Sequence, residues 1–226
     1  MKLWAENNAN FGVQHGLIVL ILMIATAVGG LWIANRSGGQ KPNIQLELPN
    51  ARWEPIFFQG IDDATQAAGI AELRTEYVPK DDIEVRVWRG FGLTPLEGIL
   101  LKRTDYQWSA IYIRRNRAED RTVEMRNLDS PKSGWEPFWI SLQDKGILKL
   151  PDSLEVGCAP GQLDGIGYVV EINQGYKYRT YMYSQNGCPE AEQMRYIAKS
   201  IATEFDTGDQ ECKTAEWFPC TGRQKE

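Results

Sequence analysis

The sequence has only one histidine, His15, and it stands just before a long apolar stretch near the N-terminus. A Ser-His-Asp triad or a Cys–His dyad uses an imidazole as its general base, so neither can form in the remainder of the chain. Zinc sites built on histidine are excluded for the same reason. The G-x-S-x-G, P-loop, EF-hand and dinucleotide-binding motifs are missing as well. We therefore expect no cofactor and no metal site.

Clusters of positive charge are also lacking. Lys and Arg number 25 against 30 Asp and Glu, the formal net charge is −5, and no basic stripe is present. This charge distribution argues against nucleic acid as a partner. Carboxylates are the catalytic groups that the composition does not exclude, and the candidates are Asp62, Asp63, Asp81, Asp82, Asp152 and Asp164. Aspartates also suit helix caps and turns, and we favour that structural interpretation.

From Gly16 to Ala34 no residue is charged, and Thr26 has the only polar side chain. As a helix this run would measure about 28 Å, close to the hydrocarbon thickness of a bilayer. The alternative is a signal peptide cleaved after Ala27, but apolar residues continue beyond that site. We therefore predict a tail at 1–15, a single transmembrane helix at 16–34, a linker at 35–43 and a folded domain at 44–226.

The orientation of the chain in the membrane depends on the cysteines. Lysine and arginine counts beside the apolar run slightly favour a cytoplasmic C-terminal domain. The four cysteines argue for the opposite side, since none belongs to a C-x-x-C pair and their spacing suits disulfides. Three pairings are possible, and hairpin symmetry together with a short loop favours Cys158–Cys188 and Cys212–Cys220. We therefore predict a single-pass protein of the cytoplasmic membrane, with its C-terminal domain in the periplasm or another extracytoplasmic space.

Alternating and helical patterns predict an α+β domain. Strands are expected over 83–88, 97–103, 107–113, 122–128, 166–172 and 176–182, with hairpin turns at 104–106 and 173–175. A helix is expected to begin at a Ser133/Glu136 capping box, and another at Pro189, with a weaker candidate over 62–74. The predicted architecture is a mainly antiparallel sheet with two or three helices packed on one face, which leaves the other face free.

The function predicted from these patterns is binding rather than catalysis. Strand alternation points one set of basic and aromatic side chains away from the expected core: Arg86, Trp88, Lys177, Arg179, Tyr181 and Tyr183. Such residues are enriched at recognition surfaces, although cross-strand pairing in a half-exposed sheet explains them too. We predict a membrane-anchored, non-catalytic accessory or binding protein, a subunit of a larger membrane-associated assembly, which contacts the bilayer through 16–34 and a protein partner at the membrane. The alternative is a carboxylate-dependent cell-envelope hydrolase acting on glycans.

Overall fold

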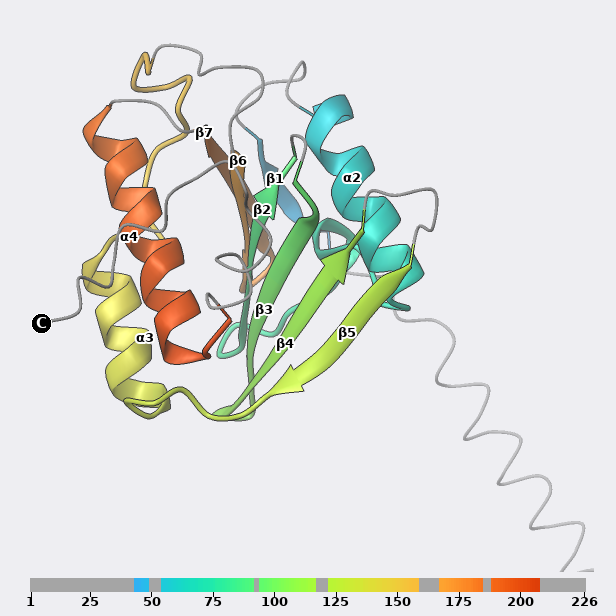
Figure 1. Ribbon diagram of the computed structural model, residues 1–226, viewed down its shortest axis with the longest axis vertical. Helices are drawn as coiled ribbons and strands as arrows, with labels where there is room; N and C mark the ends of the chain where they lie inside the picture. The colour runs from blue at the N-terminus through green and yellow to red at the C-terminus, as the bar shows by residue number, and fades with distance from the viewer. Residues whose placement is uncertain are drawn as a thin grey trace, which may run out of the picture. The chain divides into compact units, whose positions relative to one another are not determined.

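The computed structural model describes residues 43–48, 54–91, 94–116, 122–158, 167–184 and 188–207 (Figure 1). The chain divides into two compact units, 1–42 and 43–226, and every described residue belongs to the second. The predicted tail, transmembrane helix and linker up to residue 42 lie outside the described residues, as do Cys212 and Cys220. Among the residues that are described, no helix is both long enough and apolar enough to cross a membrane.

The described part of the domain contains a seven-stranded sheet with the strand order β1-β7-β6-β2-β3-β4-β5. The strands are β1 (Gln45–Glu47), β2 (Ile83–Gly90), β3 (Leu96–Thr104), β4 (Gln107–Arg115), β5 (Val123–Leu128), β6 (Gly167–Gln174) and β7 (Lys177–Ser184). Neighbouring strands are antiparallel except for β1, which pairs with β7 in parallel. The predicted α+β class and the six predicted strands are confirmed, and the short edge strand β1 makes the sheet a mixed one.

The β6–β7 hairpin turns slightly later than the sequence predicts. Gln174 pairs with Lys177, and the two residues between them, Gly175 and Tyr176, have φ angles of 58° and 69°. Positive φ at both central positions is typical of a tight two-residue hairpin turn. Asn173 lies in β6 and is fully buried, and its amide donates hydrogen bonds to carbonyl groups of the segment before β2. Asn173, which the sequence predicted to lie in the turn, therefore joins β6 to the segment before β2 inside the domain.

Three helices and a short 3₁₀ turn complete the described part: α2 (Glu54–Ala67), η1 (Leu73–Thr75), α3 (Trp135–Asp144) and α4 (Pro189–Glu204). The predicted start of α4 at Pro189 is confirmed. The predicted capping box of α3 is wrong, because Gly134 is the N-cap and the Ser133 amide donates to the Glu204 carboxylate at 2.8 Å. The weaker helix predicted over 62–74 is found earlier in the chain, as α2 at Glu54–Ala67. It ends before Gly69, whose φ of 68° suits a helix terminus.

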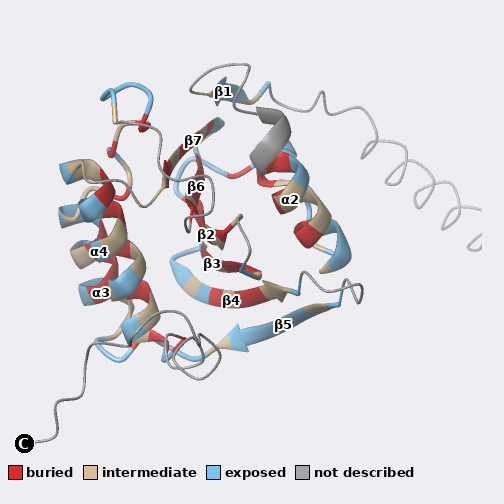
Figure 2. Cartoon of the chain, turned by 45° about the horizontal axis from the view of Figure 1, so that its top comes forward, coloured by how far each residue is buried: buried red, intermediate tan, exposed pale blue. Residues whose placement is uncertain are grey.

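The helices cover both faces of the sheet, so the prediction of helices on one face is wrong. α3 and α4 lie on one side of the sheet and α2 lies on the other (Figure 1). In β2, Val85 and Val87 pack in the core beneath α3 and α4, while Trp88 packs in the core beneath α2. Because β2 is central in the strand order, its alternating side chains are buried on both sides (Figure 2).

Candidate functional site

Trp88, predicted to be exposed, is fully buried beneath α2 and takes part in a hydrogen-bonded network around Glu171. The indole Nε1 of Trp88 donates to the Glu171 carboxylate at 2.7 Å, and the Tyr178 hydroxyl donates to its other oxygen at 2.9 Å. The indole ring lies against Gly98, where an added Cβ would be 2.4 Å from the ring. Burial raises the pKa of Glu171, and the positive charge of Arg86 opposes that rise.

Arg86 belongs to the same buried region and is also not available to a partner. Its guanidinium pairs with Glu84 at 2.7 Å and donates to the backbone carbonyl of Ala71 at 2.9 Å. Lys102 approaches the second oxygen of Glu84 at 3.2 Å. The predicted exposure of Arg86 and Trp88 is therefore wrong. Alternation separates the two faces of a strand, but it does not show whether a helix covers each face.

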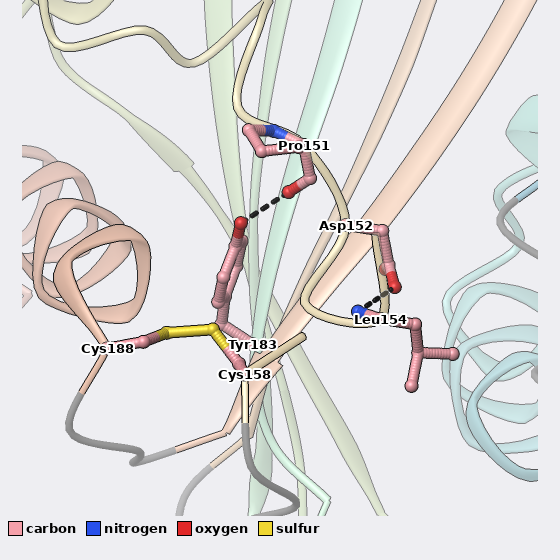
Figure 3. Close-up of a disulfide and its surroundings, with 6 residues drawn as sticks. All are labelled: Pro151, Asp152, Leu154, Cys158, Tyr183 and Cys188. Carbon is pink, nitrogen blue, oxygen red and sulfur yellow. Dashed lines mark hydrogen bonds between the residues drawn. A yellow bond between two sulfur atoms is a disulfide. The ribbon is translucent and has the colours of Figure 1, made fainter. Parts of the chain in front are cut away.

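Three of the predicted binding residues on β7 instead bind the segment 147–158, which follows α3 and which we call the strap. Arg179 donates to the carbonyl oxygens of Leu148 and Leu150 at 3.1 and 2.6 Å. The Tyr181 hydroxyl donates to the Ile147 carbonyl at 2.7 Å, and the Tyr183 hydroxyl donates to the Pro151 carbonyl (Figure 3). Burial raises the pKa of both tyrosines, which keeps their hydroxyls protonated as donors.

Tyr181 and Tyr183 are buried, Arg179 is partly buried, and Lys177 is exposed at the start of β7. The predicted exposure of the two tyrosines is therefore wrong, because the strap and the α3–α4 layer cover them. Hydroxyl and guanidinium groups do recognise a backbone here, as their chemistry suggests, but that backbone belongs to the same chain. Of the six predicted binding residues, Lys177 alone is exposed.

Asp152 and a disulfide hold the far end of the strap. The Asp152 carboxylate accepts hydrogen bonds from the backbone amides of Leu154 and Met182 at 2.9 and 2.8 Å. Cys158, the last strap residue, is bonded to Cys188, the N-cap of α4 (Figure 3). The predicted Cys158–Cys188 pair is therefore confirmed, whereas the predicted Cys212–Cys220 pair lies outside the described residues. Burial raises the pKa of Asp152, and the two amide donors oppose that rise.

Four of the aspartates proposed as an acid–base pair make structural side-chain contacts, and for Asp81 the contact is made by its backbone carbonyl, which accepts a hydrogen bond from Arg103 at 3.1 Å. Asp62 lies inside α2 and is therefore not a helix N-cap, and its carboxylate accepts two hydrogen bonds of 2.7 Å from Arg74 of η1. Asp63 pairs with Arg115 at 3.0 Å. Asp82 accepts the Asp105 amide at 3.0 Å, between two turns. The contacts of these aspartates and of Asp152 suit the structural interpretation, while Asp164 lies outside the described ranges.

A row of alternating charges crosses four strands on the α4 side of the sheet, and sequence reasoning missed it. Arg89 lies opposite Glu97, Glu97 opposite Arg114, and Arg114 opposite Glu124. Glu97 is buried, and its carboxylate lies 2.6 Å from the Arg89 guanidinium and 3.6 Å from that of Arg114. It also accepts a hydrogen bond of 2.6 Å from the Tyr112 hydroxyl. Burial and the neighbouring Glu97 raise the pKa of Tyr112. The cavity beside Glu97 measures about 20 Å³, far too small for a substrate.

The outer surface between α3 and α4 is hollowed, and we call this feature the α3–α4 furrow. It consists of two hollows of about 320 and 380 Å³, which share Lys145 and Tyr196. The lining side chains further include Ser141, Glu192, Gln193, Lys199, Ser200 and Thr203. Tyr196 is 62% exposed at the junction of the hollows. A tyrosine on the polar face of the predicted α4 helix is the sequence signal that could have indicated this furrow.

Comparison with known proteins adds no functional assignment. No protein-family model matches the sequence, and no curated protein matches it significantly. We therefore infer the function from the geometry of the chain's own residues.

Proposed function

We propose that this protein is a membrane-anchored, non-catalytic accessory protein whose folded domain binds a protein partner through the α3–α4 furrow. The anchor is the apolar segment 16–34, and the domain lies in the periplasm or another extracytoplasmic space. The uncharged run supports the anchor. The Cys158–Cys188 disulfide supports an oxidising compartment. In this proposal the protein is a subunit of a larger assembly at the membrane.

The exposed Tyr196 in the furrow carries the proposal. A tyrosine offers a large, rigid contact area and a hydroxyl, and tyrosine is enriched at protein interfaces. Lys145 and Glu192, which also line the furrow, can add charged contacts at the rim. A furrow on the outer surface of two packed helices suits a convex protein segment better than a small substrate, which binds in an enclosing pocket.

Two hydrogen bonds at the end of α3, one of them from α4, hold the floor of the furrow in place before a partner arrives. The Gln193 side chain on α4 donates to the Lys145 carbonyl, just after α3, at 2.8 Å. The Lys145 ammonium donates to the Ser141 hydroxyl within the α3 region. A surface that is ordered in advance loses less conformational entropy on binding. The furrow therefore resembles a preorganised docking surface.

The test is co-purification of the full-length chain with its partner after gentle extraction in a mild detergent. Tyr196→Ala removes the central aromatic contact and should weaken capture of the partner by about 30-fold, equivalent to about 2 kcal/mol. The matched control is Tyr106→Ala, because Tyr106 is 80% exposed on the β3–β4 turn and does not line the furrow. Equal capture by both variants would exclude the furrow as the binding surface.

A second outcome would reject the accessory role itself. If the extracted protein is found alone by sizing and mass spectrometry, and if it hydrolyses an envelope glycan in an aspartate-dependent way, the hydrolase alternative is correct. Asp152→Asn is unsuitable for that assay because it disturbs the strap. Asp63→Asn is better, since Asp63 is partly exposed and has a single described ion pair.

A further inference from the structure

Strand β5 forms an open edge of the sheet. It is last in the strand order, and its four central residues, 124–127, are exposed (Figure 2). No other strand in the described part of the chain pairs with its outer side. The opposite edge, β1, has only three residues, which is a common way of limiting edge pairing. β5 is twice as long and presents unpaired backbone groups that can accept another strand.

The charge row ends at this open edge with the negative charge of Glu124, which has no strand on its outer side in the described part of the chain. It runs Arg89, Glu97, Arg114 and then Glu124, so Glu97 and Arg114 each have opposite charges on both sides. Arg89 at the inner end lies between Glu97 and Tyr168, and Glu124 at the outer end has a strand on one side only. Directly opposed residues on neighbouring strands share one face of the sheet, and opposite charges there are favourable. A strand added beyond β5 would continue the alternation if it placed a cation opposite Glu124.

The sequence of β5 itself supplies that cation. Two antiparallel strands related by a twofold axis perpendicular to the sheet must place one residue opposite its own copy. With Met125 at the axis, Glu124 lies opposite the partner's Arg126, and Arg126 lies opposite the partner's Glu124. With Glu124 or Arg126 at the axis, like charges would oppose each other, which is destabilising. One register therefore satisfies both charges.

We propose that β5 pairs in antiparallel fashion with β5 of a second copy of this chain, about a twofold axis at Met125. The two sheets then become one continuous sheet, and the charge row continues from Glu124 to the partner's Arg126. Met125, which is 51% exposed in the single chain, is covered by the partner's Met125. Val123 and Asn127 complete the paired segment.

Arg126 can contact Tyr112 within its own chain and still be available to pair with the partner's Glu124. Its guanidinium lies over the Tyr112 ring, 4.9 Å from the ring centre, and it remains on the exposed surface. Stacking uses the face of the guanidinium and leaves its N–H groups for a carboxylate. Tyr112 is in turn fixed by its hydrogen bond to Glu97. This contact holds Arg126 of β5 on the same face of the sheet as Glu124, which is the face on which it would meet the partner's Glu124.

Charge reversal in the full-length protein tests this register. Glu124→Arg alone places arginines opposite arginines across the twofold, and Arg126→Glu alone places glutamates opposite glutamates. Each variant should raise the dimer dissociation constant at least about tenfold, equivalent to about 1.4 kcal/mol. A 1:1 mixture of the two variants should restore dimers, because the introduced arginine then faces the introduced glutamate at one position and a native pair forms at the other.

The mixture also separates binding from folding, because two damaged chains would not rescue each other. Light scattering of the detergent-extracted protein, corrected for bound detergent, gives the state of each sample. Wild-type protein that remains monomeric, variants that dimerise as the wild type does, or a mixture that fails to recover would each overturn the proposal. The α3–α4 furrow is not involved, so none of these outcomes bears on the proposed partner binding.

A cysteine at the axis provides a second, geometric test. In the proposed register Met125→Cys faces its own copy with Cα atoms about 4.5–5.5 Å apart, within disulfide range. The matched control is Val123→Cys, whose copy would be displaced by four residues, about 13 Å along the strand. We expect a covalent dimer on a non-reducing gel for Met125→Cys only. Equal cross-linking by both variants, or none by Met125→Cys, would contradict the twofold register.

Discussion

At the scale of single residues, Glu171 shows how a buried acid is accommodated in the middle of a sheet. The carboxylate is fully enclosed, with Trp88 and Tyr178 as its hydrogen-bond donors. Neither donor can be removed without leaving an unsatisfied buried oxygen, which generally costs about 1–3 kcal/mol. Arg86 provides the nearby positive charge that opposes the rise in the pKa of Glu171. These residues are therefore better explained by the stability of the core than by binding at its surface.

The raised pKa of Glu171 predicts a pH dependence of stability. The folded protein holds the proton on Glu171 more tightly than the unfolded chain, so the free energy of unfolding falls as pH rises from the ordinary glutamate value of 4.5 through the higher folded-state pKa. Glu171→Gln keeps the shape of the side chain and cannot ionise. We expect its free energy of unfolding, measured in urea between pH 4.5 and 8, to fall less steeply than that of the wild type.

Part of the slope should persist in the variant, because burial raises the pKa of Asp152 as well and acts with the same sign. The comparison is therefore between two slopes and not between a slope and a flat line. Parallel curves for the wild type and Glu171→Gln would show that Glu171 has the same proton affinity in both states.

The residue scale is also where prediction from sequence was weakest. Alternation in "IEVRVW" correctly separated Val85 and Val87 from Arg86 and Trp88. Whether a face of a strand is buried depends on which helix covers it. The sequence pattern did not predict that α2 begins at Glu54, so it did not predict the helix that covers Trp88. The charge row was hidden for a similar reason, since Arg89, Glu97, Arg114 and Glu124 come from four strands whose register a single sequence does not specify.

At the scale of elements, the strap is held mainly by side chains of β7. Arg179, Tyr181 and Tyr183 bind four of its first five carbonyl groups, and Asp152 joins it to the backbone of β7. A segment without helix or strand has no regular backbone partners, so donors from elsewhere must satisfy its buried carbonyls. The strap therefore depends on this set of donors for its position.

This dependence predicts the effect of removing two hydroxyls. Tyr181→Phe and Tyr183→Phe each delete one bond to a strap carbonyl, and each should lower the free energy of unfolding by about 1 kcal/mol. The double variant should also accelerate hydrogen exchange at the Ser153 amide, which donates to the Met182 carbonyl in the wild type. Tyr106→Phe is the matched control, because Tyr106 lies exposed on a turn. If the double variant exchanges as the control does, the hydroxyls do not hold the strap.

Elements with strong local signals could be predicted, and those that depend on distant contacts could not. The hairpin strands, α4 and the Cys158–Cys188 pair follow from alternation, a proline start and hairpin symmetry. By contrast, β1 has three exposed residues with no alternation, and its place is set by β7. The N-cap of α3 at Gly134 likewise reflects a distant contact, because the Glu204 carboxylate accepts the hydrogen bond from the Ser133 amide that Glu136 would accept in a local capping box.

At the scale of the whole molecule, the two proposed contact surfaces lie on different elements. The α3–α4 furrow belongs to the helical layer, and the β5 edge ends the sheet (Figure 1). Pairing at β5 uses the backbone of an edge strand, whereas binding in the furrow uses side chains of two helices. A chain with both contacts could be a symmetric dimer and still present two furrows to partners. The accessory role and the proposed dimer are therefore compatible.

If the anchor places the domain outside the cytoplasm, the redox state of Cys158 and Cys188 should depend on whether the chain contains the anchor. In a bacterial host the full-length chain should sediment with membranes, and alkylation after acid quenching should find Cys158 and Cys188 protected. A chain of residues 43–226, made in the reducing cytoplasm, should stay in the soluble fraction with both thiols alkylated. Oxidation of that shorter chain should then raise its free energy of unfolding by about 3–4 kcal/mol, because the bond closes a loop with a sequence separation of 30. A full-length chain with alkylated Cys158 and Cys188 would place the domain in the cytoplasm, and one that remains soluble would exclude the anchor.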